Sequence, residues 1–177
     1  MPATAYHSGY TTLSIALHWL GAIAVIALFV THEGPRGSVA FAFHVSGGAI
    51  LGILLLWRVF HRLNRGLAPQ PAQHGVLNLL ARLVTFGFLA AILVVVLTGY
   101  LLPWTVGQPI DIYGWISIPS PLSPSRDFHE IMEQAHNIAG HLFPPLLILH
   151  VLGALKHAII DRDGILRSMV RPSLTGK

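Results

Sequence analysis

The sequence predicts an all-α protein, a transmembrane four-helix bundle, from its composition and from the lengths of its apolar runs. Hydrophobic residues make up 53% of the 177-residue chain and charged residues only 10%, which is too apolar for a soluble domain of this size. Four apolar runs reach the roughly 20 residues that cross a bilayer. They lie at 13–30, 39–59, 83–102 and 138–160. The remaining chain is too short for a second core, so residues 1–177 are expected to form a single integral-membrane domain.

The basic residues predict the orientation of the chain in the membrane. They cluster beside the apolar runs rather than on a soluble face, which argues against a nucleic-acid partner. The connector between the second and third spans and the carboxyl-terminal tail are rich in Lys and Arg, whereas the two other loops hold only Arg36 and Arg126. The positive-inside rule then puts both termini in the cytoplasm and surrounds the spans with lipid.

The fourth apolar run is unusual because the stretch from Gln134 to His157 carries four histidines. His136 and His150 are fourteen positions apart, so on a helix they lie within about 40° of one another. They are also separated by about 21 Å along the axis, so one is expected near each membrane surface. Pro144 and Pro145, between them, predict a kink.

The predicted topology places two further histidines at the same two depths. His18, near the start of the first span, can meet His150, and His44, early in the second span, can meet His136. Two imidazoles facing each other in an apolar bundle require a metal between them, and bis-histidine haem b supplies one. The chain has no cysteine, which excludes thiolate ligands and covalent c-type haem. Interhelical hydrogen bonding, or a histidine-lined path for protons or metal ions, is the alternative interpretation.

Glycines accompany these four histidines. Each has glycine three or four positions later, which would leave room on the helix for the edge of a porphyrin. These glycines are Gly21, Gly47 with Gly48, Gly140 and Gly153, and none of the other seven histidines has one. Close packing of membrane helices also uses small residues, so the pattern has a structural alternative.

Other polar residues are candidates for contacts at the two ends of the bundle. On the inner side, Arg58, Arg82, Lys156 and His157 could neutralise haem propionates or bind a quinone carbonyl, although anchoring of the span ends accounts for them equally well. On the outer side, Arg36, Arg126, His32 and His129 could steer a small anion, or simply solvate the loops.

Several motifs together resemble the bacterial cytochrome b561 family over nearly the whole chain. They are Leu17-His18-Trp19, Phe43-His44-Val45-Ser46-Gly47-Gly48, Arg58 with Arg62, Thr98-Gly99-Tyr100, His136, and Leu149 to His157 followed by Asp161 to Leu166. The resemblance implies a di-haem protein of the bacterial inner membrane that takes electrons from periplasmic superoxide and reduces ubiquinone, a superoxide oxidase. It implies His18 with His150 as ligands of the inner haem and His44 with His136 as ligands of the outer haem. Arg82 stands where many relatives have histidine.

The superfamily also includes cytochrome b subunits that relay electrons within larger membrane dehydrogenase or hydrogenase complexes, which is the alternative function. The sequence leaves open whether the bundle forms a homodimer or docks to a redox partner subunit. It also leaves open the physiological donor and direction, the haem potentials and the residues that bind quinone.

Overall fold

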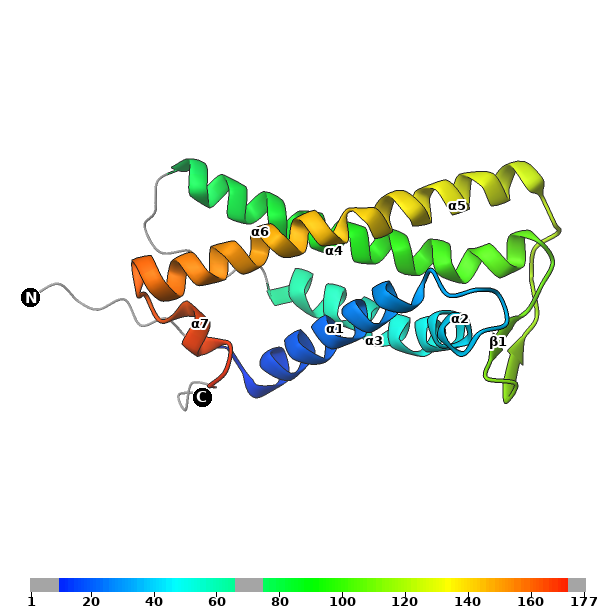
Figure 1. The fold of residues 1–177 in the computed structure, drawn as a ribbon, viewed down its shortest axis with the longest axis horizontal. Helices are drawn as coiled ribbons and strands as arrows, with labels where there is room; N and C mark the ends of the chain where they lie inside the picture. Colours follow the sequence, from blue (N-terminus) through cyan, green and yellow to red (C-terminus); the bar gives the residue numbers. More distant parts are fainter. Residues whose placement is uncertain (1–9, 66–74, 172–177) are drawn as a thin grey trace, which may run out of the picture.

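A computed structural model describes residues 10–65 and 75–171, which form a bundle of long helices (Figure 1). Four helical segments in this part of the chain are long and apolar enough to cross a membrane, as the sequence predicts. They are Thr12–Thr31, Val39–Asn64, Gly75–Thr105 and Arg126–Asp161. The four-helix membrane architecture is therefore confirmed, although the second and fourth spans are each built from several helical pieces.

The first two spans are joined by a short turn-rich loop. Helix α1, Thr12–Thr31, begins at the side chain of Thr11, which accepts a hydrogen bond from the Ser14 amide over 3.2 Å. The second span starts with α2, Val39–Ala42, where Ser38 caps the amide of Phe41 in the same way. It continues through a π-helical turn η1, Phe43–Gly47, into α3, Gly48–Arg65. The π turn contains His44, and such turns often occur at functional sites.

Helix α4, Gly75–Thr105, is the third span, and it is longer than the apolar run at 83–102. The sequence places Arg82 at the start of this span, but the structure places it two turns inside the helix. Pro103 lies inside the last turn of α4, which ends two residues later at Thr105. A proline there removes one helical hydrogen bond, the one that the Gly99 carbonyl would accept, and the helix ends soon afterwards.

The fourth span consists of α5, Arg126–His141, α6, Phe143–Lys156, and a second π turn η2, His157–Asp161. The helix begins twelve residues before the predicted run at 138–160, because its first turns are amphipathic and an apolar run does not reveal them. Leu142 separates α5 from α6, and Pro144 and Pro145 follow in the first turn of α6, so the interruption lies where the prolines predict it. A short helix α7, Ile165–Ser168, comes after the span.

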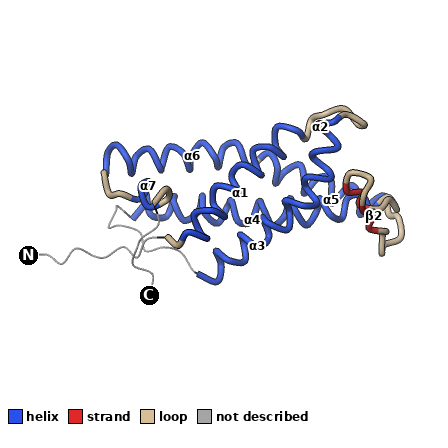
Figure 2. The backbone as a smooth tube through the Cα atoms, turned by 90° about the horizontal axis from the view of Figure 1, so that it is seen from below, coloured by secondary structure: helices blue, strands red, loops and turns tan. Residues whose placement is uncertain are grey.

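A small β-hairpin between α4 and α5 lies at the end of the bundle near η1 (Figure 2). Strands β1, Ile110–Ile112, and β2, Ile116–Ile118, are antiparallel, with Asp111 opposite Ser117. The buried hydroxyl of Ser46 in η1 donates to the Asp111 carbonyl over 3.1 Å and accepts from the Tyr113 amide over 3.0 Å. The all-α prediction contains no strands, because three-residue strands carry almost no periodic signal.

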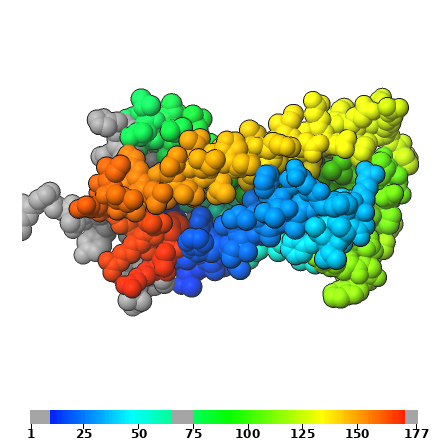
Figure 3. Space-filling model, in the orientation of Figure 1, coloured from blue at the N-terminus to red at the C-terminus, as the bar shows by residue number. Residues whose placement is uncertain are grey.

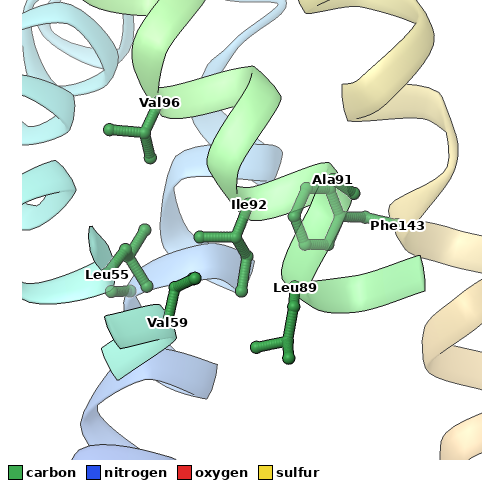
Figure 4. Packing of buried hydrophobic residues seen from close by; sticks show 8 residues of the cluster. Leu55, Val59, Leu89, Ala91, Ile92, Val96 and Phe143 are labelled. Carbon is green, nitrogen blue, oxygen red and sulfur yellow. The ribbon is translucent and has the colours of Figure 1, made fainter. Parts of the chain in front are cut away.

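The helices form two layers, α4 with α5 and α6 in one and α1 with α3 in the other (Figure 1). Helix α4 packs on both α3 and the α5–α6 segment, so it joins the layers. The hydrophobic core lies between them and includes Leu55, Val59, Leu89, Ile92, Val96 and Phe143 (Figure 4). Phe143 is seven residues from both His136 and His150, so this core separates the two histidine depths.

Core packing at the middle of α3 is expected to set the stability of the bundle. Leu55 is 2% exposed and lies in the cluster with Ile92 of α4, whereas Leu63, on the same helix, is 57% exposed. We expect Leu55→Ala to lower the free energy of unfolding by about 2 to 4 kcal/mol, because it leaves a cavity. Unfolding in detergent, followed by circular dichroism, measures the change. Leu63→Ala is the matched control, and an equal effect of both variants would contradict this core.

Candidate functional site

The structure brings the four span histidines together in two pairs. His18 on α1 faces His150 on α6, and His44 in η1 faces His136 on α5. We call them the inner pair and the outer pair, after the topology that the sequence predicts. The ring centroids are 6.1 Å apart in both pairs, with interplanar angles of 50° and 89°. Each pair therefore bridges the two layers of the bundle, one pair on either side of the Phe143 core.

This spacing fits two imidazoles that bind one metal ion from opposite sides. A metal–imidazole bond is about 2 Å long and the ring centroid lies roughly 1 Å behind the nitrogen, so two such rings have centroids about 6 Å apart. Both pairs meet this condition. A direct hydrogen bond between the two rings would not require a centroid distance of about 6 Å. The donor set is purely imidazole in each pair, which suits haem iron.

The hydrogen bonds of the outer pair use Nδ1 of each ring and leave Nε2 as the nitrogen that could bind a metal. Nδ1 of His44 lies 2.8 Å from the carbonyl oxygen of Leu28, so Nδ1 must donate the proton and Nε2 keeps its lone pair. Nδ1 of His136 lies 3.1 Å from the hydroxyl of Thr98, whose own proton goes to the Val94 carbonyl over 2.6 Å. His136 therefore also donates through Nδ1. Metal-bound histidines characteristically have such a partner on the second nitrogen.

The inner pair is arranged differently because Arg58 contacts His18 directly. The guanidinium donates to the carbonyls of Leu17 and His18 over 3.0 and 2.9 Å, and to Nδ1 of His18 over 3.1 Å. An arginine cannot accept a hydrogen bond, so Nδ1 of His18 is an acceptor here, unlike Nδ1 of His44. From the sequence we expect Arg58 at a propionate or a quinone, and the structure places it on the histidine itself.

The glycines near the paired histidines fall into two groups. On the α5–α6 segment, a Cβ built on Gly140 or Gly153 would meet no atom within 4 Å, so open space lies beside His136 and His150. On the opposite layer the space is filled, since a Cβ on Gly21 would lie 2.9 Å from Arg58. Space that a porphyrin edge could occupy therefore lies at Gly140 and Gly153, whereas Gly21 makes room for an arginine.

Two further histidines extend the outer pair, His32 beside His44 and His141 beside His32. The sequence placed His32 on the outer side but did not predict these ring contacts. The ring of His32 lies 6.3 Å from that of His44 and 6.4 Å from that of His141, measured between centroids. His32 is half-buried, and its Nδ1 contacts the Phe29 carbonyl. The signal was present in the sequence, because the end of the first span and the start of the second must lie at the same depth.

The remaining predicted site residues occupy separate places at the inner end. Nζ of Lys156 lies 2.5 Å from a carboxylate oxygen of Asp161, and Nδ1 of His157 lies 2.6 Å from Asp163 and 3.2 Å from Asp161. Arg82 is exposed on α4, and in the described part of the chain no contact joins it to this cluster. Lys156 and His157 thus form one polar group with two aspartates, apart from Arg58 and Arg82.

Comparison with known proteins identifies the family. Residues 9–172 match the prokaryotic cytochrome b561 family. The chain is also 25% identical over 178 residues to cytochrome b561 homolog 2 of Escherichia coli (strain K12), covering 93% of this chain and 92% of that protein. The chain belongs to the prokaryotic cytochrome b561 family. It is therefore a multi-pass membrane haem protein, and its family implies haem b and electron transfer across the membrane.

Proposed function

We propose that this cytochrome b561 holds two haems b, an inner one between His18 and His150 and an outer one between His44 and His136. In this proposal it oxidises superoxide on the outer side and reduces ubiquinone on the inner side. The observation that carries the proposal is the pair of equal 6.1 Å imidazole spacings, both bridging the two helix layers at separate heights. The orientation proposed is that of a bacterial inner-membrane protein with both termini in the cytoplasm, since Arg36 and Arg126 lie at the end away from most basic residues.

Haem b, when bound, supplies a carrier that takes up and releases one electron at a time. The residues of the chain determine how the haem could react. In each pair, one histidine from either helix layer would hold the haem iron, and ligation by two histidines would favour electron transfer over the binding of dioxygen at the metal. The reactants must then exchange electrons at the ends of the bundle, where polar side chains can position them.

The outer end offers positive and donor groups for a small anion. Arg36 is exposed in the loop before α2, and Arg126 is exposed at the start of α5, where it pairs with Glu130 over 2.9 Å. His32 lies against the outer histidine pair. These groups can raise the local concentration of superoxide near His44. Each superoxide gives up one electron and leaves as dioxygen.

The inner end offers groups for propionates and for the quinone. Arg58 is held beside His18, and Arg82, Lys156 and His157 lie at the same end of the bundle. Reduction of ubiquinone to quinol takes two electrons and two protons. The hydrogen bond between His157 and Asp163 can hold a proton at Nδ1 for that step.

A second candidate function is that of an electron-relay subunit in a larger dehydrogenase or hydrogenase complex. The observation that favours it is the β-hairpin at the outer end, where Trp115 is 86% exposed next to exposed Ile116. Exposed aromatic residues on a loop are common anchors of protein interfaces. A stable partner that copurifies through this hairpin would support the relay function.

Mixing purified oxidised protein with superoxide tests the proposed donor. We expect rapid haem reduction followed by stopped-flow absorbance, and a slower second-order rate in the Arg36→Gln variant because one steering charge is lost. The difference should shrink at high ionic strength, where charges are screened. Reduction no faster than in a solution of free haem b would refute superoxide as the donor.

Removing a proposed ligand should remove one haem. We expect His44→Ala and His150→Ala each to retain about half of the wild-type haem, because each belongs to a different pair. Haem extracted from a known amount of protein measures this content. His61→Ala is the control, since His61 lies on α3 and belongs to neither pair. Unchanged content in both ligand variants would disprove the assigned ligands.

The hydroxyl of Thr98 is expected to hold the His136 ring in position. Thr98→Val removes the acceptor of the Nδ1 proton and should weaken binding of the outer haem by about 10- to 100-fold. Haem titration of the apoprotein measures the affinity. Thr85→Val is a matched control, because Thr85 also bonds to a carbonyl of α4 but contacts no paired histidine. If the two variants bind haem equally well, Thr98 has no such role.

A further inference from the structure

The chain reverses direction immediately after the fourth span and forms a pocket there. Arg162 and Gly164 both adopt left-handed backbone conformations, with φ of 51° and 78°, and turn the chain into α7. The indole of Trp19 on α1 donates to the Met169 carbonyl over 2.9 Å and fastens this segment to the bundle. The resulting pocket has a volume of about 560 Å³ and lies between η2 and the segment that includes α7. Figure 3 shows this segment lying beside the end of the fourth span.

Three arginines line this pocket, Arg162, Arg167 and Arg171. Arg167 and Arg171 are one helical turn apart, and the amide of Arg171 donates to the Arg167 carbonyl over 3.0 Å, so both side chains lie on the same side of the segment. Arg162 uses Nε to donate to the Ile159 carbonyl over 3.2 Å. Within the described residues its terminal guanidinium nitrogens have no hydrogen-bond partner, so they could contact a ligand. All three residues are exposed.

The nearby carboxylates are occupied by other groups. Asp161 pairs with Lys156 and His157, and Asp163 contacts His157 and accepts from the Ile165 amide over 3.0 Å. In residues 10–65 and 75–171 no carboxylate forms an ion pair with any of the three arginines. The pocket therefore presents three arginines, none of which forms an ion pair within the described part of the chain.

The other wall of the pocket is apolar. Ala158, Leu166 and Val170 line it, and Ile159 and Ile160 on the adjoining turn are 63% and 73% exposed. A ligand that fits would carry an anionic group for the arginines and hydrocarbon for this wall. Arginine binds phosphate oxygens in pairs, so a phosphate is the best match for the charged side. A free, hydrated phosphate would gain nothing from the apolar side.

We propose that this pocket binds the phosphodiester headgroup of an anionic phospholipid, whose acyl chains lie along Ile159 and Ile160. The pocket stands at the end of a membrane span, where basic pockets meet the headgroup layer. The site involves none of the paired histidines, so the proposal does not depend on the haem assignment. A lipid bound there would link α7, η2 and, through Met169, α1.

Lipid binding to the purified full-length holoprotein in detergent tests the proposal. Native mass spectrometry with added phosphatidylglycerol or phosphatidylcholine counts bound lipids directly. We expect phosphatidylglycerol to bind about tenfold more tightly than phosphatidylcholine, and the double variant Arg167→Gln/Arg171→Gln to lose that preference. Arg36→Gln/Arg126→Gln removes the same charge from the opposite end, and we expect it to keep the preference.

Competition with inorganic phosphate distinguishes a lipid from a soluble anion. Phosphate at a few millimolar is expected not to displace phosphatidylglycerol, because it lacks the apolar contact. Displacement by phosphate would mean that the pocket binds a soluble anion, and equal loss in the two double variants would mean that only total charge matters. Either result overturns the proposal.

A conservative variant keeps the test decisive if the glutamine variant does not fold. Arg167→Lys/Arg171→Lys keeps the charge but not the paired geometry, and we expect intermediate affinity for phosphatidylglycerol. Together with the comparison of the two lipids on the wild-type protein, this variant still decides the question. Equal binding of the two lipids to the wild-type protein would overturn the proposal.

Discussion

The whole bundle depends on the need to satisfy buried imidazoles in an apolar layer. A polar ring placed in hydrocarbon is costly unless its nitrogens find partners. Here the two rings of each pair face each other from opposite layers, so α1 and η1 lie across from α6 and α5 at matched heights. Helix α4 connects the two layers, because it packs on α3 in the opposite layer and on the α5–α6 segment in its own. The Phe143 core fills the space between the two levels.

The number of spans and their order could be read from the sequence, because hydropathy over some 20 residues is a strong signal. The residues at which the helices begin and end could not be read from it. The start of α5 is amphipathic, and Asn78 and Arg82 interrupt the apolar sequence in the first turns of α4. The π turns at His44 and His157 leave no mark in hydropathy, since they change the path of a helix without changing its composition. The hairpin over Ser46 was missed because its strands are three residues long.

The pairing of the histidines was within reach of sequence reasoning, because helix rise converts residue number into depth. The hydrogen-bond partners of the second nitrogen of each imidazole could not be predicted from the sequence. These contacts depend on how each helix is rotated about its axis, which residue spacing alone does not set. They include the bond from His136 to Thr98 and the position of Arg58 against His18 and Gly21. The two pairs consequently differ in a way that the sequence did not suggest. Nδ1 donates in His44 and His136 and accepts in His18, so the two proposed haems would have ligands of different electron-donating strength.

In the proposed arrangement two histidine pairs, and no other residues, hold the prosthetic groups. The electron paramagnetic resonance spectrum of the oxidised, purified protein, taken together with its haem-to-protein ratio, tests this most directly. Two imidazoles on one iron give a low-spin ferric centre, so the account predicts two haems b per chain and low-spin signals only. A single haem per chain, or a high-spin signal from an iron with an open position, would contradict it.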